Sequence, residues 1–384
     1  MGRVRYTISG AYSSPCCGSP DMKCKRAFTL VELVVVVAIV GVLLAVRVGT
    51  LDHDRKQASV RADVANLRLI AQASSIYAAE NADRLFTFSW RPGEVPVTPN
   101  ADLAIACANL SPNSPTADLR AGTLQQLDLV ARSIDSVWLA PVPSNAAQNH
   151  IPHVLYSHLP LQFYMGESFP SEVFISKADA ARNYWMKDLN GYLKNPRNSF
   201  FRPPSTSTNF VSLWRWAFSS SYMTGPSHYA PDFGPPQTVA RMGTHRQWTT
   251  TREPGLLGRR AANEVAHPSA KVMMFDDMDR YTGQGQFGML PGSRSTMNFY
   301  DGHAGRFATD QADYGFAPNN PASGADTPDQ PSALYFYSPI SWWDPPGSVR
   351  TRVAARYDQT RDGLQGIDYS PGSVRRPIRA QFGR

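Results

Sequence analysis

The chain has 384 residues, of which 42% are hydrophobic and 18% are charged, with 31 prolines and 27 glycines. This composition excludes a disordered chain and a long coiled coil, and it predicts one or two globular domains that are rich in loops. The formal net charge is +7 at pH 7, but the basic residues gather near the two ends of the chain and the body is mixed, so nucleic-acid binding is not expected.

The residues before Phe28 are basic and hold most of the cysteines. They carry five basic side chains and one acidic side chain. Cys16, Cys17 and Cys24 lie in this segment, so a chain that starts at Phe28 keeps only Cys107 and forms no internal disulfide. We expect Cys107 to be a small, buried apolar side chain.

An apolar stretch runs from Phe28 to Val46. Its length approaches the ~20 residues with which a helix crosses a bilayer. The basic residues before it predict a single membrane span, with the N-terminus in the cytoplasm and the body outside. A secretory signal peptide is the alternative. The stretch is long for one, however, and Arg47 and a polar segment follow it in place of a small-residue cleavage site.

Glu32 lies inside this apolar stretch. An ionised carboxylate there costs about 2.5–3.5 kcal/mol on insertion scales, so it needs a partner. The stretch from Phe28 to Val46 contains no Lys, Arg or His. The partner must therefore come from another chain or from a new positive charge, and a cut before Phe28 would create one in the free α-amino group.

The segment RAFTLVELVVVVAIVGVLLA resembles the N-terminal motif of type IV pilins and of the pseudopilins of type II secretion systems. That family has a short basic leader, a small residue that is normally Gly, then Phe-Thr-Leu-(Ile/Val)-Glu and an apolar helix. The resemblance implies that a prepilin peptidase cuts between Ala27 and Phe28 and methylates the new N-terminus. It also implies that Glu32 pairs with the N-terminal amine of a neighbouring subunit during assembly. Ala27 departs from the usual Gly.

The pattern after Arg47 predicts that the helix continues. Neither Gly nor Pro occurs between Arg55 and Pro92. An apolar stripe at helical spacing predicts a face that packs against a globular domain rather than a free stalk; it comprises Val60, Val64, Leu67, Ala71 and Ala78. We expect one helix from about Phe28 to Glu80, softened near Gly49.

The rest of the chain reads as short strands broken by Pro, Gly, Asn and Ser. Strands are expected in LFTFSW, HVLYSHL, LQFYM, EVFIS, FVSLWRWAFSSSYM, SAKVMMFDDMD and STMNFYDGHAGRF, and a short helix in AGTLQQLDLVARSI. The fold class is therefore α+β, with one long N-terminal helix, transmembrane and then amphipathic, packed on an antiparallel sheet with large loop insertions. This arrangement is pilin-like.

We divide the chain into five segments. These are a cytoplasmic leader (1–27), a transmembrane assembly helix (28–47), its amphipathic continuation (48–84), an extracytoplasmic β-rich domain (85–340) and a Pro/Gly/Arg-rich tail (341–384). The sequence PGSVR occurs twice in the tail, at Pro346 and Pro371. A plain solvated tail is the favoured interpretation, and a mobile or partner-docking tail is the alternative.

The end of the β-rich domain adds a second resemblance. HPSAKVMMFDD followed by MNFYDGHAGRF is similar to the C-terminal region of a pseudopilin-like subgroup of planctomycete-type bacteria, in which a late strand carries Asp-Gly-His. The best metal candidates lie here: Asp276, Asp277, Asp279, Asp301 and His303. Carboxylates near a loop suit Ca²⁺, and the resemblance allows calcium because some major pseudopilins hold it in a C-terminal loop. The spacing is not that of an EF-hand, and Asp is common where strands enter turns, so a structural role stays open.

Catalytic motifs are missing from the sequence. GQGQFG leads into MLPGS rather than a helix, so it forms no phosphate cradle. Neither H-E-x-x-H nor G-x-S-x-G occurs. Three aromatic residues fall on one face of an expected strand: Trp214, Trp216 and Phe218. We favour a packed core for them over a sugar-binding site.

We therefore expect a structural pilus or pseudopilus subunit that is not an enzyme. Its expected partners are prepilin peptidase, other pilin or pseudopilin subunits and an inner-membrane assembly platform. The alternative is a membrane-tethered binding module or hydrolase with a pilin-like anchor.

Overall fold

The computed structural model describes residues 29–114, 117–132, 154–166, 169–203, 213, 215–229, 240–241, 248–249, 258–282, 285–315, 334–337, 339, 344, 347–360 and 362–370. The chain forms two compact units, residues 1–54 and residues 55–384. Helix α1 (Leu30–Glu80) contributes to both units, so each part of it is described with its own unit. Gly49 does not interrupt α1, and the predicted softening there stays a prediction.

In the first unit, the described side chains of α1 are apolar and exposed. From Leu30 to Leu43 the sequence is almost wholly aliphatic, with Glu32 as its charged residue. Among the residues that the structure describes, no helix combines the length and the apolar character that a membrane crossing requires.

In the second unit, α1 packs by the predicted stripe. Leu67 and Ala71 are buried, Val60, Val64 and Ala78 are partly buried, and Arg68 on the opposite side is exposed. The helix ends where the sequence predicts. The backbone N–H groups of Asn81 and Asp83 both donate to the carbonyl of Ala78, which satisfies it at the helix terminus.

The second unit contains a four-stranded antiparallel sheet with the strand order β1-β4-β7-β8. Its strands are β1 (Tyr222–Thr224), β4 (Val272–Asp276), β7 (Arg294–Phe299) and β8 (Ala304–Ala308). Leu67 of α1 clusters with Met274 of β4, and Asn298 Nδ2 of β7 donates to the Leu67 carbonyl at 2.8 Å. The expected α+β class with an antiparallel sheet is therefore confirmed.

Three two-stranded ladders surround this sheet. They pair β2 (Ala240–Arg241) with β3 (Trp248–Thr249), β5 (Met278–Asp279) with β6 (Gln286–Phe287), and β9 (Leu334–Tyr337) with β10 (Thr351–Ala354).

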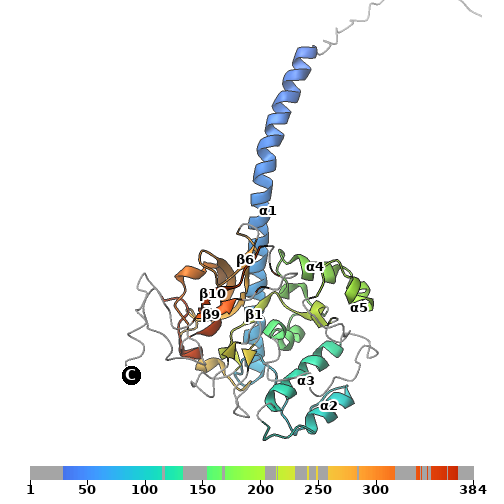
Figure 1. Cartoon of the computed structure of the whole chain (residues 1–384), viewed down its shortest axis with the longest axis vertical. Coiled ribbons are helices and arrows are strands. Elements are labelled where there is room, and N and C mark those ends of the chain that lie inside the picture. Colours follow the sequence, from blue (N-terminus) through green and yellow to red (C-terminus); the bar gives the residue numbers. More distant parts are fainter. Residues whose placement is uncertain are drawn as a thin grey trace, which may run out of the picture. The chain divides into compact units, whose positions relative to one another are not determined.

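Four shorter α-helices and a set of 3-10 helices complete the described elements. The α-helices are α2 (Ala101–Ala108), α3 (Ala117–Ala131), α4 (Ala180–Lys187) and α5 (Leu189–Lys194). The 3-10 helices are Val154–Tyr156, Leu159–Tyr164, Glu172–Phe174, Pro196–Asn198, Arg215–Phe218, Pro226–His228, Ala262–Glu264, Thr309–Gln311, Tyr357–Gln359 and Gly363–Gln365. Helices α2 and α3 lie side by side (Figure 1) and share a small core around Trp90 and Cys107. Cys107 is fully buried, as expected.

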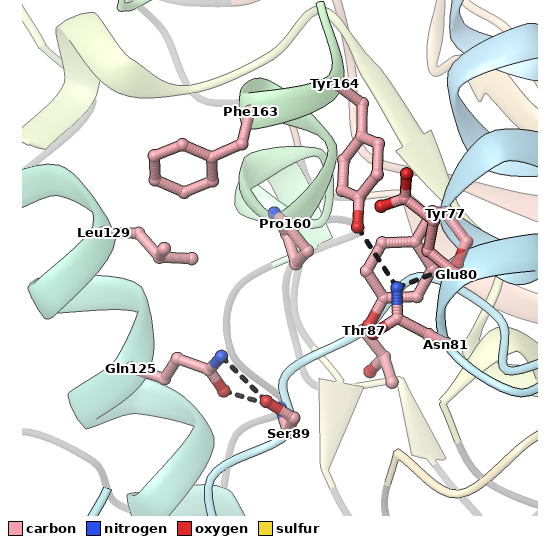
Figure 2. Close-up of a pocket in the computed structure, with 10 residues that line it drawn as sticks. All are labelled: Tyr77, Glu80, Asn81, Thr87, Ser89, Gln125, Leu129, Pro160, Phe163 and Tyr164. Carbon is pink, nitrogen blue, oxygen red and sulfur yellow. Dashed lines mark hydrogen bonds between the residues drawn. The ribbon is translucent and has the colours of Figure 1, made fainter. Parts of the chain in front are cut away.

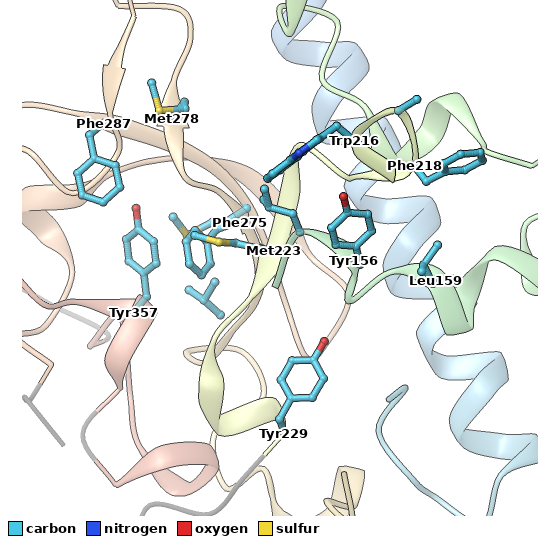
Figure 3. Packing of buried hydrophobic residues seen from close by; sticks show 14 of the residues in the cluster. Tyr156, Leu159, Trp216, Phe218, Met223, Tyr229, Phe275, Met278, Phe287 and Tyr357 are labelled. Atoms are coloured by element: carbon cyan, nitrogen blue, oxygen red, sulfur yellow. The ribbon is translucent and has the colours of Figure 1, made fainter. Parts of the chain in front are cut away.

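The main core is rich in aromatic residues (Figure 3). Trp216 and Phe218 are buried in it, so the packed-core interpretation of these two residues is confirmed. Trp214 lies outside the described residues. Phe275 of β4 and Tyr357 meet edge to face, with ring centroids 4.9 Å apart. Such pairs add about 0.5–1.5 kcal/mol beyond the area that they bury.

Several predicted strands are wrong. HVLYSHL and LQFYM fold into the 3-10 helices Val154–Tyr156 and Leu159–Tyr164, since Pro160 lacks a ladder donor and a short buried apolar run does not distinguish helix from strand. EVFIS forms the 3-10 helix Glu172–Phe174, capped by Ser171. LFTFSW forms no strand.

FVSLWRWAFSSSYM contributes only its last residues to a strand, β1. Part of this segment, residues 210–212 and Trp214, lies outside the described residues. The serines before β1 divert backbone hydrogen bonds: Ser219 Oγ donates to the Trp216 carbonyl at 2.7 Å and Ser220 Oγ donates to the Phe174 carbonyl at 2.9 Å. Side chains that bond local backbone in this way compete with a ladder.

The prediction of one strand in STMNFYDGHAGRF is also wrong, because β7 and β8 form a hairpin there. Gly302 in the turn has a φ of +91°, a conformation that favours glycine. SAKVMMFDDMD does form strands, as β4 and β5. The expected helix in AGTLQQLDLVARSI is confirmed as α3, which begins four residues earlier than expected, at Ala117.

The expected solvated tail is wrong for the described residues between 347 and 370. Strand β10 pairs with β9 in this region. Tyr357 and Leu364 are buried, although single apolar residues set among Arg, Gly and Pro gave no periodic signal. Residues 371–384 lie outside the described chain.

Candidate functional site

The N-terminal motif begins with a reciprocal cap on α1. Glu32 Oε2 accepts hydrogen bonds from the backbone N–H and the hydroxyl of Thr29, each at 2.9 Å. The Glu32 N–H donates in return to Thr29 Oγ1 at 3.3 Å. This is a capping box, in which a Thr before a helix and a Glu three residues later satisfy each other's backbone donors. The carboxylate is therefore hydrogen-bonded within its own chain. The predicted cleavage residues Ala27 and Phe28 lie outside the described residues.

The part of α1 that follows this cap carries exposed apolar side chains. Ten large aliphatic residues between Val31 and Leu43 are at least 47% exposed in the chain by itself. They are Val31, Leu33, Val34, Val35, Val36, Val37, Ile39, Val40, Val42 and Leu43. An exposed apolar surface of this extent marks a contact with other proteins or with a membrane.

Two of the metal candidates are held by arginines. Asp276 accepts hydrogen bonds from Arg280 Nε at 2.6 Å and Nη2 at 3.1 Å. Asp279 pairs with Arg306 Nη2 at 2.7 Å and also accepts three backbone N–H bonds. Burial raises the pKa of Asp276 to about 7, although the Arg280 guanidinium opposes this shift. These carboxylates serve ion pairs within the fold.

The remaining candidates do not complete a metal centre. Asp277 is buried beside Asp276 and contributes to its raised pKa. Asp301 and His303 form a separate pair in the β7–β8 turn, with 2.6 Å between Oδ1 and Nδ1. Within the described part of the chain, no group of three or more His, Cys, Asp or Glu side chains is placed to hold a metal ion. Calcium binding stays a prediction that this geometry does not support.

The same Arg280 guanidinium extends this charge network from β4 to α4. Asp179 accepts hydrogen bonds from Arg182, and it also pairs with Arg280 Nη2 at 3.2 Å. Burial by itself would raise the pKa of Asp179, but Arg280 and Arg182 together hold it well below its usual range. The network thus links the sequence-distant Asp179 and Asp276 through one guanidinium.

The sequence analysis did not identify the capping box or the buried Asp63, although the sequence contains a signal for each. The T-x-x-E pattern of Thr29–Glu32 before an apolar run is the signature of a capping box. Asp63 falls on the apolar stripe of α1, three residues after Val60 and four before Leu67, and it is fully buried. An acid at such a position predicts a specific polar partner in the fold.

Comparison with known proteins gives one finding. Residues 22–46 match the family model of the prokaryotic N-terminal methylation motif. No curated protein and no solved structure matches the chain. The matched range includes Ala27, Phe28 and Glu32, and it leaves the resemblance of the C-terminal Asp-Gly-His segment untested.

Proposed function

The chain carries a prepilin-type N-terminal methylation motif, which supports a type IV pilin- or pseudopilin-like family. From this premise we propose that it is a structural subunit of a type IV pilus or a type II secretion pseudopilus. In this proposal a prepilin peptidase cuts before Phe28, and α1 assembles with the helices of other subunits. The protein catalyses nothing. Its partners are the peptidase, other subunits and an assembly platform in the inner membrane.

The match over residues 22–46 carries this proposal. The exposed aliphatic surface from Val31 to Leu43 supports it, because lipid or neighbouring helices of the same kind would cover that surface. Before assembly the first part of α1 would lie in the inner membrane as a single-pass anchor, with residues 1–27 in the cytoplasm and the second unit outside.

Glu32 has two successive roles in this scheme. In the single chain its carboxylate accepts two hydrogen bonds from Thr29, which reduces the cost of holding it in apolar surroundings. In the filament its charge pairs with the α-amino group of Phe28 on a neighbouring subunit. The ion pair would contribute more in lipid than in water, because the effective dielectric constant is low there.

The proposal is tested by the N-terminal mass of the mature protein and by one charge substitution. In a bacterial host with a prepilin peptidase, the mature chain should begin with N-methylated Phe28. Glu32→Gln keeps the hydrogen-bond acceptor of the cap but removes the charge, so it should leave processing intact and prevent incorporation into filaments.

Asp102→Asn is the matched control, because Asp102 is an exposed acid outside the motif. It should be processed and incorporated like the unchanged protein. A mature chain that retains residues 1–27, or equal incorporation of Glu32→Gln and Asp102→Asn, would refute the proposal.

A further inference from the structure

Two adjoining cavities lie beside the C-terminal end of α1. The larger has a volume of about 490 Å³ (Figure 2), and the smaller has a volume of about 370 Å³. Four residues line both cavities, so the two adjoin; they are Tyr77, Asn81, Thr87 and Ser89. We call the pair the α1-end groove. Volumes of this size are typical of small-ligand sites.

The larger cavity has an aromatic wall. Phe163 and Tyr164 come from one 3-10 helix and line it opposite Gln125 of α3 (Figure 2). The Tyr164 ring meets Tyr77 of α1 edge to face, with centroids 5.5 Å apart. Phe163 is 58% exposed although the Arg132 guanidinium carbon lies over its ring, 5.9 Å from the centroid, so part of the ring remains open to a ligand. The electron-rich face of an aromatic ring attracts the C–H groups of a flat ligand.

A buried hydroxyl without a partner belongs to Thr87, which lines the groove. Thr87 is 5% exposed, and its Oγ1 has no hydrogen-bond partner among the described residues. Gly258, with a φ of +72°, lines the smaller cavity beside it. A Cβ at this position would lie 3.3 Å from Thr87 Oγ1 and 2.9 Å from the Phe88 carbonyl oxygen. The Gly258 backbone thus lies close against Thr87 and the Phe88 carbonyl, and an unpaired buried hydroxyl costs about 1–3 kcal/mol unless a ligand satisfies it.

Three arginines line the smaller cavity. Arg84 Nη1 donates to the Arg259 carbonyl at 2.7 Å, and Arg91 Nη2 donates to the Gly258 carbonyl at 3.4 Å, so backbone oxygens hold two of the guanidinium groups in place. Among the residues that line the two cavities, Glu80 is the single acid. The basic end is therefore suited to an anion, which Arg binds in a fork geometry.

The mutual repulsion of these arginines supports the same conclusion. The pKa of Arg91 is lowered by burial first and by Arg259 second, while Asp118 and Glu94 act in the opposite direction. Arg259 is exposed, and no ion pair joins it to a carboxylate among the described residues. A bound anion would reduce this repulsion.

We propose that the α1-end groove binds an acidic saccharide, that is, pyranose rings that carry carboxylate or sulfate groups. One ring face stacks on Phe163 or Tyr164, ring hydroxyls bond to Thr87 Oγ1 and to the amides of the groove, and the anion lies among the arginines. A peptide is a poorer match, because the lining residues belong to helices and loops and offer no strand edge for backbone pairing.

The test uses the full chain, purified in detergent, and titration calorimetry at fixed ionic strength. The probes are trigalacturonate, a sulfated galactose trimer and the neutral maltotriose. At least one acidic probe should bind about tenfold more tightly than maltotriose, the difference expected for a charge-assisted pair. The acidic probe that binds more tightly identifies the anion.

Matched substitutions locate the site. Arg259→Gln, Phe163→Ala and Thr87→Val should each weaken binding of the acidic probe by about fivefold or more. The controls are Arg202→Gln and Phe200→Ala, which alter an exposed Arg and an exposed Phe outside the lining residues and should leave the affinity unchanged.

Four results would overturn the proposal. These are equal binding of maltotriose, equal losses in Arg259→Gln and Arg202→Gln, tighter binding of a tripeptide with a free carboxyl terminus, and no heat of binding at about 10 mM of either acidic probe, a concentration above the millimolar range of weak specific ligands.

Discussion

The hydroxyl of Tyr281 donates a 2.5 Å hydrogen bond to the carboxylate of Asp63, which lies 218 residues earlier on α1. The same carboxylate accepts bonds from Ser176 Oγ at 2.6 Å and from the Lys177 N–H at 2.9 Å. Asp63 is fully buried. One acid therefore joins the second part of α1 to two separate loops of the body.

Removing this acid should destabilise the second unit. Asp63→Ala leaves the buried donor of Ser176 and the half-buried donor of Tyr281 without this acceptor, and an orphaned buried donor costs about 1–3 kcal/mol. We expect the free energy of unfolding to fall by about 3 kcal/mol, measured by urea unfolding of the full chain in detergent with tryptophan fluorescence. Tyr281→Phe removes one donor and should cost about 1 kcal/mol.

The control for this experiment is Asp54→Asn, which alters an exposed acid on the same helix. A double-mutant cycle between Asp63 and Tyr281 should give a coupling of about 1 kcal/mol or more, because the two side chains are in direct contact. If Asp63→Ala is as stable as Asp54→Asn, the carboxylate does not anchor α1.

The cap on α1 should be separable from the charge of Glu32. Thr29→Ala removes the two bonds that the Thr29 hydroxyl makes in the capping box and should weaken the first turn of α1 by about 1 kcal/mol, whereas Thr29→Ser keeps them. Hydrogen exchange of the backbone N–H groups of residues 30–33 in detergent should be faster in Thr29→Ala alone. Filament incorporation should persist in both variants. Loss of incorporation in Thr29→Ala, as complete as in Glu32→Gln, would mean that assembly needs the cap itself.

The sequence could predict those elements whose signal lies in one short stretch of residues. The stripe with Leu67 and Ala71 has the helical period, and the run that becomes β4 is apolar and bounded by turn residues, so both were found. Segments such as Leu159–Tyr164 have no clear period because their first four residues are all buried, and their conformation depends on partners that are distant in sequence.

The candidate site divides in the same way. Phe28 and Glu32 belong to a contiguous motif, so one segment of sequence identifies them. Thr87 and Arg91 of the α1-end groove come from one loop and Arg259 from another, and only the fold brings the two loops together. Asp276 and Asp279 resembled metal ligands because the sequence does not reveal which arginines, Arg280 and Arg306, would meet them.

The C-terminal segment should be essential for stability up to residue 370. Lys271 Nζ and Asp368 Oδ2 form a fully buried ion pair at 2.9 Å, and Thr360 Oγ1 donates to the other oxygen of Asp368 at 2.6 Å. Asp368→Ala leaves the Lys271 charge buried without its partner, which should cost about 3–5 kcal/mol. Thermal unfolding of the full chain in detergent would measure this loss.

Two truncations provide the comparison for that measurement. Deletion of residues 351–384 removes β10 and Asp368 and should prevent stable folding. Deletion of residues 371–384 retains every described contact and should leave the melting temperature unchanged. If the longer deletion is as stable as the shorter one, the segment that ends at residue 370 does not form part of the core.

Acid should destabilise the body through two buried histidines. Burial lowers the pKa of His158 to about 3 and that of His228 to about 4, from an ordinary value of 6.5. Between pH 6.5 and these values the unfolded chain binds protons that the folded chain does not. Stability is therefore fully present above pH 6.5 and falls as the pH is lowered, by about 1.4 kcal/mol per pH unit for each histidine.

His158→Leu isolates this effect. The His158 Nδ1 is buried without a hydrogen-bond partner among the described residues, and the ring packs on Phe174, so leucine preserves the packing and loses no bond there. The stability difference between His158→Leu and the unchanged chain should grow by about 1.4 kcal/mol per unit from pH 6.5 to pH 4.5, as measured by urea unfolding. Contributions from carboxyl groups such as Asp276 are common to both proteins and cancel in this difference. His228 does not offer the same test, because its ring bonds the Phe86 carbonyl at 2.7 Å and the Tyr300 hydroxyl at 2.8 Å, and leucine would lose both bonds. A difference that does not change with pH would show that His158 titrates in the folded chain as it does in the unfolded chain.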